Sequence, residues 1–302
     1  MRSLRSHRLR LVRRCALLLL CLPLVLAACD ASGNLGDTGK SVPGYTPAQM
    51  RAAYGLTSLY NKGMRGKGQT IVVIESFGSP TLQHDMDVFC QQFGLPSIKL
   101  KVYAPLGTKP YDASNKDMRG WVGETSEDVE LIHALAPDAN IVVMTSPVDE
   151  TEGTIGLPEF LQLEQYAVDH HLGTIISQSF GVSEYTLTDD RGQQEIQRWH
   201  DFYQQATTEQ GITFFASSGD EGATDYADLD ATHLVPNRTS SFPNDDPWVT
   251  SVGGTTLNIG DDGSVSESAW NGSGGGFSAF YSQPDYQRSL PSNAQDQFDG
   301  RR

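Results

Sequence analysis

The strongest constraint on the fold is a regular alternation between two kinds of segment. Short apolar runs, rich in β-branched residues and bounded by turn-forming residues, recur six times. They span residues 70–75, 98–103, 140–145, 173–179, 212–217 and 248–253. Segments with the helical spacing of apolar residues lie between them, at 81–93, 124–135, 160–170 and 194–210. The alternation predicts an α/β fold, in which helices cover both faces of a mostly parallel sheet of buried strands.

Residues that follow the predicted strands are the first candidates for a functional site. The carboxyl ends of parallel strands meet at one edge of a sheet, and active sites of such folds collect there. Glu75 follows the first predicted strand, and the segments Ser179-Phe180-Gly181 and Ser218-Gly219-Asp220 follow two later ones.

The N-terminal segment has the features of an export signal. Six arginines and no acidic residue lie within the first 14 residues, and the apolar run 16–28 is too short for a stable membrane-spanning helix. We therefore expect a signal peptide over 1–28, a flexible tether over 29–44 and one domain over 45–302. Cys29 directly follows Leu26-Ala27-Ala28, which resembles the lipobox of bacterial lipoproteins and implies that Cys29 is acylated.

Lipidation at Cys29 would make the protein an extracytoplasmic, membrane-anchored lipoprotein of the cell envelope. Two alternatives stay open: an ordinary signal peptide with a chance cysteine, which gives a secreted protein, and a retained transmembrane anchor.

Charge and cysteine content exclude several classes of function. The net charge is −15, and without the six arginines 16 basic residues face 37 acidic ones, which argues against a nucleic-acid partner. Cys15, Cys21 and Cys29 lie in the N-terminal segment, so Cys90 is alone in the body. We therefore expect no disulfide framework. We also expect no metal site, because one cysteine cannot form a cysteine site and the sequence has no HExxH pattern.

Two acidic motifs are candidates for chemistry. Glu124 and Asp128 lie four residues apart on a predicted helix and share one face. Two carboxylates that are close and shielded from water share a proton, so one of them becomes a base in acid. With Glu127 and Glu130 nearby, the alternative is a solvated acidic face. Asp220 ends a Ser/Gly turn, and alone it is an ordinary turn aspartate.

A series of short motifs, in order along the body, resembles the sedolisin family, the serine-carboxyl peptidases. The motifs are Tyr45-Thr46-Pro47-Ala48-Gln49, Gly66-Lys67-Gly68-Gln69-Thr70-Ile71, Glu124-x3-Asp128, Ala134-Leu135-Ala136-Pro137, Ser177-x-Ser179-x-Gly181, Ser217-Ser218-Gly219-Asp220, Val252-Gly253-Gly254-Thr255 and Gly274-Gly275-Gly276-Phe277-Ser278. The resemblance implies a subtilisin-like fold and a serine-type endopeptidase that cleaves proteins or peptides in acid.

The resemblance also implies roles for individual residues. Glu124 would be the general base for a serine nucleophile, and Asp128 would orient it. Asp220 would be protonated and would donate a hydrogen bond to the oxyanion.

Other matches concern the surroundings of these acids. Glu75 aligns with an acid that extends the carboxylate network in some relatives, although a loop residue at a strand end is the alternative. Ser179, Phe180 and Gly181 would line the substrate cleft, and Phe180 stands where several relatives have tryptophan. His133 is expected to be a packed helix residue.

Two family features have no counterpart in the sequence. The nucleophile of the family lies in a Gly-Thr-Ser segment that precedes a calcium-binding loop, so we expect both beyond Arg302, a C-terminally incomplete fold and an inactive 302-residue chain. The long pro-domain of the family has no room between Cys29 and Tyr45. Ser278 matches a structural segment of the family and is not the nucleophile.

Two functions follow as expectations. The first is an acid-acting serine peptidase, monomeric and without a cofactor in this chain, whose nucleophile segment lies downstream. The second is a non-catalytic lipoprotein, derived from a peptidase, that binds a peptide or a partner. A solute-binding lipoprotein of a transporter fits the anchor alone.

Overall fold

The computed structural model describes residues 44–289 and 300–302. The predicted signal peptide, Cys29 and the predicted tether up to residue 43 lie outside the described residues. In the described part of the chain, no helix has the length and apolar character needed to cross a membrane.

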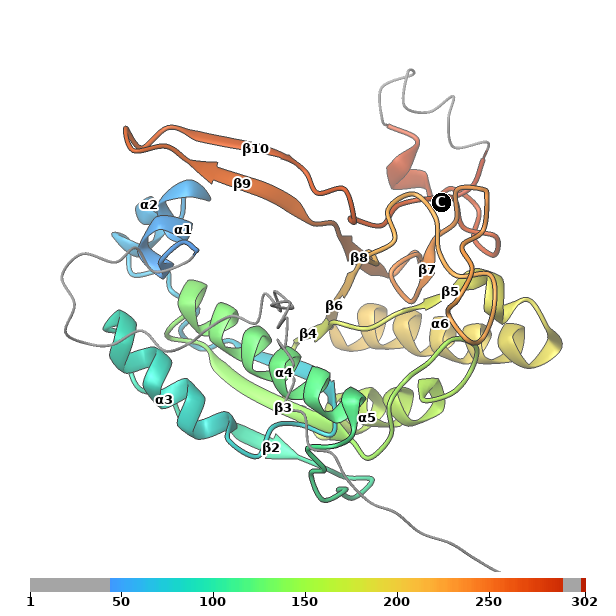
Figure 1. Cartoon of the computed structure of the whole chain (residues 1–302), viewed down its shortest axis with the longest axis horizontal. Coiled ribbons are helices and arrows are strands. Elements are labelled where there is room, and N and C mark those ends of the chain that lie inside the picture. Colours follow the sequence, from blue (N-terminus) through green and yellow to red (C-terminus); the bar gives the residue numbers. More distant parts are fainter. Residues whose placement is uncertain (1–43, 290–299) are drawn as a thin grey trace, which may run out of the picture. The chain divides into compact units, whose positions relative to one another are not determined.

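A six-stranded parallel sheet forms the centre of the fold, with the strand order β2-β3-β1-β4-β6-β8 (Figure 1). The strands are β1 (Thr70–Ser76), β2 (Lys101–Tyr103), β3 (Asn140–Ser146), β4 (Ile175–Gln178), β6 (Thr213–Ser217) and β8 (Val249–Val252). Each of the six predicted runs overlaps one of these strands, and the prediction of a mostly parallel sheet is confirmed.

Helices cover both faces of the sheet, as the alternation predicted. They are α3 (Leu82–Phe93), α4 (Lys116–Leu135), α5 (Leu157–Asp169) and α6 (Asp190–Gln210). Side chains of a strand alternate between the faces. Val73 of β1 therefore lies in an apolar cluster with Met86 of α3 and Val129 of α4. Val72 lies in a second cluster, which contains Trp199 of α6.

The prediction that all strands are buried is wrong at both edges of the sheet. Val102 of β2 is 55% exposed and Val252 of β8 is 50% exposed. Each of these strands pairs with a neighbour on one side only, so less of its surface is covered than in the central strands.

Helix α4 begins eight residues earlier than predicted. The side chain of Asn115 accepts hydrogen bonds from the backbone N–H groups of Asp117 and Met118, which caps the helix at its start. Gly120 and Gly123 weaken the helical pattern of the first turns, which is why the sequence did not reveal them.

Several short elements were not predicted. They are α1 (Pro47–Ala53), α2 (Thr57–Tyr60), β5 (Val182–Ser183), η1 (Glu184–Leu187), β7 (Ser241–Phe242), β9 (Thr255–Ile259), β10 (Val265–Ala269) and η2 (Asp285–Gln287). Strands β9 and β10 form a hairpin that extends toward α1 and α2 (Figure 1). Tyr45, just before α1, accepts a hydrogen bond from the backbone N–H of Ile259 in this hairpin at 2.9 Å.

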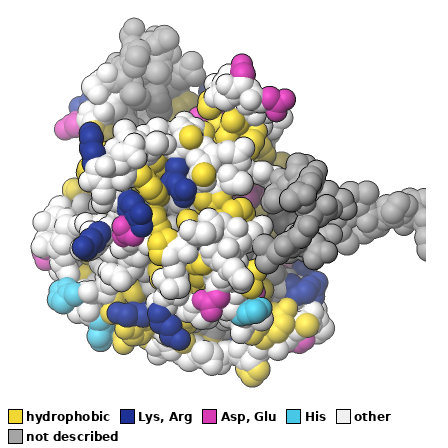
Figure 2. Space-filling model, turned by 90° about the vertical axis from the view of Figure 1, so that its left-hand side faces the viewer, with side chains coloured by type: hydrophobic (Ala, Val, Ile, Leu, Met, Phe, Trp, Pro, Cys, Tyr) yellow, Lys and Arg dark blue, Asp and Glu magenta, His cyan; other side chains and the backbone are white. Residues whose placement is uncertain are grey.

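Charged side chains are spread over the surface that Figure 2 shows. Lys and Arg side chains are interspersed with uncharged surface and a few acidic side chains. This face therefore presents no continuous basic patch.

Candidate active site

The carboxyl ends of β1 and β4 bring three acidic side chains and one serine together. Val73 of β1 pairs with Ser177 of β4, and this register places Ser179 next to Glu75 at the edge of the sheet. Val73 faces α4, so Glu75, two residues further along the strand, faces α4 as well. We call Glu75, Glu124, Asp128 and Ser179 the acid–base cluster.

Glu75 is completely buried inside β1, so the alternative of a loop residue at the strand end is wrong. Its Oε2 accepts a hydrogen bond from the hydroxyl of Thr125 at 3.2 Å. Burial, followed by the charges of Asp128 and Glu124, raises the pKa of Glu75 well above its usual range. A protonated Glu75 donates a hydrogen bond to Asp128, which satisfies an otherwise unpaired buried oxygen.

Glu124 and Asp128 lie on the same face of α4, one turn apart, and both are partly buried. The hydroxyl of Ser179 donates a hydrogen bond to Asp128 Oδ2 at 2.8 Å. Burial raises the pKa of Glu124 to about 7, and the charge of Asp128 adds to this shift. The pKa of Asp128 is also raised by burial, although hydrogen bonds from Ser179 and Glu75 oppose the shift. The alternative of a solvated acidic face therefore fits Glu127, which is exposed, but not these two residues.

Asp220 is exposed on the loop that follows β6. Its charge contributes to the raised pKa of Glu124. The backbone of Gly219 and Gly274 is joined by a 2.8 Å hydrogen bond, and a Cβ on Gly274 would lie 1.8 Å from the carbonyl oxygen of Ser218. Only glycine permits this close approach, which holds the Asp220 loop in place. The role of Asp220 at an oxyanion stays a prediction.

The segment 179–181 differs from the prediction in one respect. The side chain of Phe180 is 3% exposed, and its ring centroid lies 4.5 Å from that of Phe160 and 6.2 Å from that of Trp199. The prediction that the Phe180 side chain lines the cleft is therefore wrong, because this side chain points into the core beside α5 and α6. The position of the Ser179 and Gly181 backbone in a cleft stays a prediction.

Acidic residues after β3 were missed in the sequence. Burial raises the pKa of Glu150 to about 8, and its carboxylate accepts a hydrogen bond from the backbone N–H of Gly181. Glu152 accepts a hydrogen bond from the backbone N–H of Ser183 at 2.9 Å. The strand-end rule would have pointed to these residues, since they follow a central strand of the sheet.

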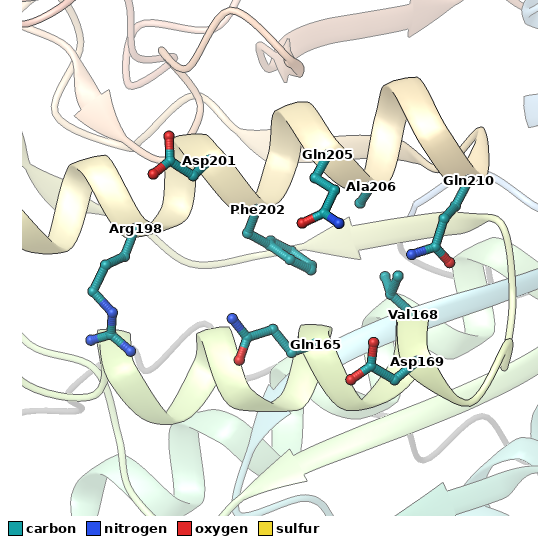
Figure 3. Close-up of a pocket in the computed structure, with 9 residues that line it drawn as sticks. All are labelled: Gln165, Val168, Asp169, Arg198, Asp201, Phe202, Gln205, Ala206 and Gln210. Atoms are coloured by element: carbon teal, nitrogen blue, oxygen red, sulfur yellow. The ribbon is translucent and has the colours of Figure 1, made fainter.

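Other candidate positions lie apart from the acid–base cluster. His133 is completely buried, and its Nε2 lies 2.7 Å from the carbonyl oxygen of Pro96. Within residues 44–289 and 300–302, no three His, Cys, Asp or Glu side chains are grouped so as to hold a metal ion. A groove of about 400 Å³ lies between α5 and α6 (Figure 3). It is lined by Gln165, Val168, Asp169, Arg198, Asp201, Phe202, Gln205, Ala206 and Gln210.

Known proteins resemble the chain in sequence and in structure, although no family model matches it. Kumamolisin from Bacillus sp. (strain MN-32) is 30% identical over 257 residues, which cover 80% of this chain and 41% of that protein. The solved structure of Pseudomonas sedolisin, a serine-carboxyl proteinase complexed with pseudo-iodotyrostatin, superposes with a TM-score of 0.66 at 25% identity. The match covers 86% of this chain and 68% of that one.

The chain belongs to the sedolisin family. Its α/β fold is the subtilisin-like fold of sedolisins. A fungal member, tripeptidyl-peptidase sed4 from Aspergillus fumigatus, is 31% identical over 185 residues, which cover 55% of this chain and 28% of that protein. The chain thus spans about two fifths of the length of kumamolisin and less of the fungal sedolisin.

Proposed function

We propose that the acid–base cluster belongs to a serine-type endopeptidase of the sedolisin class, which cleaves proteins or peptides in acid outside the cytoplasm. The observation that carries this proposal is the state of Glu124. A glutamate is a poor base near neutral pH unless its pKa is raised, and burial beside Asp128 raises that of Glu124 to about 7.

The proposed mechanism assigns one step to each acid. Glu124 takes the proton of a serine nucleophile as it attacks the substrate carbonyl. Asp128, held by Ser179 and Glu75, keeps Glu124 oriented and raises its affinity for that proton. Asp220 donates a hydrogen bond to the oxyanion, which requires its protonated form. The base must be ionised while the oxyanion acid is protonated, so we expect a bell-shaped pH profile on the acid side of neutrality.

We place the nucleophile in a Gly-Thr-Ser segment outside residues 1–302, together with the calcium site of the family. Ser278 is unsuited to the role, because it is completely buried and its hydroxyl donates a 2.5 Å hydrogen bond to Glu184.

A peptidase assay with matched variants tests the proposal. The product of the complete reading frame is incubated with an unfolded protein substrate at several pH values between about 4 and 7, so that the assay covers the acid range up to the pKa of Glu124. We expect Glu124→Gln to lower the rate by roughly 10²- to 10⁴-fold, because the general base is lost. Glu209→Gln, at an exposed position of α6 away from the acid–base cluster, is the control and should retain the rate. Full activity of Glu124→Gln would overturn the proposal.

Residues 30–302 alone should cleave no protein substrate at any pH. Cleavage by this fragment that disappears in Glu124→Gln would show that another nucleophile has been recruited.

We further propose that Cys29 is acylated and anchors a monomeric protein to the cell envelope, on the strength of the lipobox-like sequence. Cys29→Ser should then move the protein from the membrane fraction to the soluble fraction. An unchanged distribution of Cys29→Ser between the membrane and soluble fractions would show that Cys29 does not anchor the protein.

The alternative is a non-catalytic lipoprotein that binds a peptide or a partner. Sequencing the DNA beyond codon 302, with an intact mass of the native protein, separates the two. A downstream Gly-Thr-Ser segment would support the peptidase, whereas a stop codon with a matching mass would support the binding protein.

A further inference from the structure

The hydroxyl of Ser179 contacts the carboxyl groups that α4 presents on one face. It donates a hydrogen bond to Asp128 Oδ2 at 2.8 Å, and hydrogen bonding from Ser179 also opposes the raised pKa of Glu124, one helical turn away. Residues on both sides fix its backbone: β4 ends one residue earlier in register with β1, and Phe180 is anchored in the core. A side chain on such a rigid backbone holds its geometry better than one on a free loop.

A serine hydroxyl has one proton and two lone pairs, so it can donate to only one of these carboxyl groups at a time. When Glu124 is protonated, it can donate to Ser179, which in turn donates to Asp128. When Glu124 is ionised, the hydroxyl can turn and donate to Glu124, and the proton of Glu75 then supplies Asp128. No covalent bond changes in this exchange, and Ser179 keeps its proton throughout.

We propose that Ser179 is a positioning residue that couples Glu124 to Asp128 by turning its hydroxyl whenever Glu124 gains or loses a proton. This inference rests on the proposed function, and it gives Ser179 a role other than contact with substrate. The other titratable groups around this bridge are Glu75 on β1, Glu127 on α4 and Asp220 on the loop after β6.

Carboxyl titration of the full chain tests the bridge without any need for peptidase activity. The side-chain carboxyl carbons of Asp and Glu are labelled with ¹³C, and their NMR resonances are followed as a function of pH. The resonances of Glu124 and Asp128 are assigned by their disappearance in Glu124→Gln and Asp128→Asn. We expect Ser179→Ala to raise the pKa of Glu124 by about one unit and to raise that of Asp128, because both ionised forms lose a donor. Ser179→Thr, which keeps the hydroxyl, should restore both values. Ser177→Ala, two residues earlier on β4, is the matched control.

A serine that only contacts substrate would leave these titrations unchanged. Equal midpoints in wild type, Ser179→Ala and Ser177→Ala would therefore overturn the bridge. If Ser179→Ala does not fold, Ser179→Cys decides, because the thiol has nearly the same size but is a weaker donor and should also raise both pKa values. Midpoints in Ser179→Cys equal to those of the wild type would contradict the proposal.

The outcomes also separate this inference from the proposed function. Loss of activity in Glu124→Gln with unchanged Ser179→Ala titrations would leave the peptidase and remove the bridge. Shifted titrations in Ser179→Ala, in a protein whose complete reading frame has no peptidase activity, would support the bridge and overturn the proposed peptidase function.

Discussion

Two of the groups of buried carboxyl side chains in the described part of the chain differ in their access to solvent. In the acid–base cluster, Glu124 is only partly buried. The second group, which we call the Glu184 cluster, consists of Glu184, Asp245 and Ser278, and no member is more than 3% exposed. Burial raises the pKa of Glu124 in the first cluster and of Asp245 in the second.

Hydrogen bonds explain what the Glu184 cluster does. Glu184 accepts from the hydroxyl of Ser278 at 2.5 Å and from the backbone N–H of Ala279 at 2.6 Å. Burial and the charge of Glu184 favour the protonated form of Asp245, which donates a hydrogen bond to Glu184, while hydrogen bonding from Ser278 opposes the shift in its pKa. The cluster thus joins η1, the loop after β7 and the segment 278–279.

The contrast shows how burial can serve two purposes. A carboxyl group with a raised pKa is useful for proton transfer only while one side stays reachable, as for Glu124. A fully enclosed group of the same kind fixes chain segments in place instead.

The largest effect should come from removing the centre of the Glu184 cluster. We expect Glu184→Ala to lower the free energy of unfolding by about 3–5 kcal/mol, because buried donors and Asp245 lose their acceptor. Urea denaturation measures the change. Glu209→Ala, at an exposed position of α6, should cost less than about 0.5 kcal/mol. Equal losses in the two variants would show that the Glu184 cluster does not hold the fold together.

A smaller effect should appear in the pH dependence of stability. The folded-state pKa of Asp245 is raised, so the folded chain keeps a proton that the unfolded chain releases above about pH 4. Its stabilising contribution is therefore complete below that pH and is lost as the pH rises toward the folded-state pKa. Glu75 and Glu164, which are also completely buried, act with the same sign.

Asp245→Asn should flatten this dependence. The slope of the free energy of unfolding between about pH 4 and 7 should become less steep by up to about 1.4 kcal/mol per pH unit, since one titrating group is removed. Denaturation series at several pH values measure the slope. Asp230→Asn, at an exposed position, makes the same chemical change and should leave the slope unaltered.

The smallest effect concerns the acid–base cluster itself. We expect Asp128→Asn to lower the pKa of Glu124 by about one unit, because a neighbouring negative charge disappears. Glu127→Gln should lower it less, since the charge of Glu127 makes a smaller contribution. Carboxyl NMR titration checks both, and a larger shift in Glu127→Gln would reverse the assignment of Asp128 as the main partner.

The sequence predicted the features that depend on local periodicity. Apolar runs of strand length and helical spacing identified the parallel sheet and its four covering helices, and the spacing of Glu124 and Asp128 placed both on one helix face. The motif series also identified the sedolisin family, which the comparisons confirm.

Features that depend on distant contacts were not predictable in this way. Phe180 lies in the core because its ring packs against Phe160 and Trp199, and neither is its neighbour in sequence. The bond from Ser179 to Asp128 spans 51 residues, and that from Ser278 to Glu184 spans 94. Only the register of the strands and the packing of the loops bring such pairs together.

A single carboxyl titration of the wild-type chain tests the contrast between the two clusters most directly. The NMR resonances of Glu124 and Asp245 are followed in one sample while circular dichroism reports whether the chain stays folded. We predict that Glu124 titrates reversibly with a midpoint of about 7, whereas Asp245 stays protonated well above its usual pKa range. A Glu124 midpoint near the ordinary value of about 4.3, or an Asp245 midpoint near the ordinary value of about 3.9, would contradict the account.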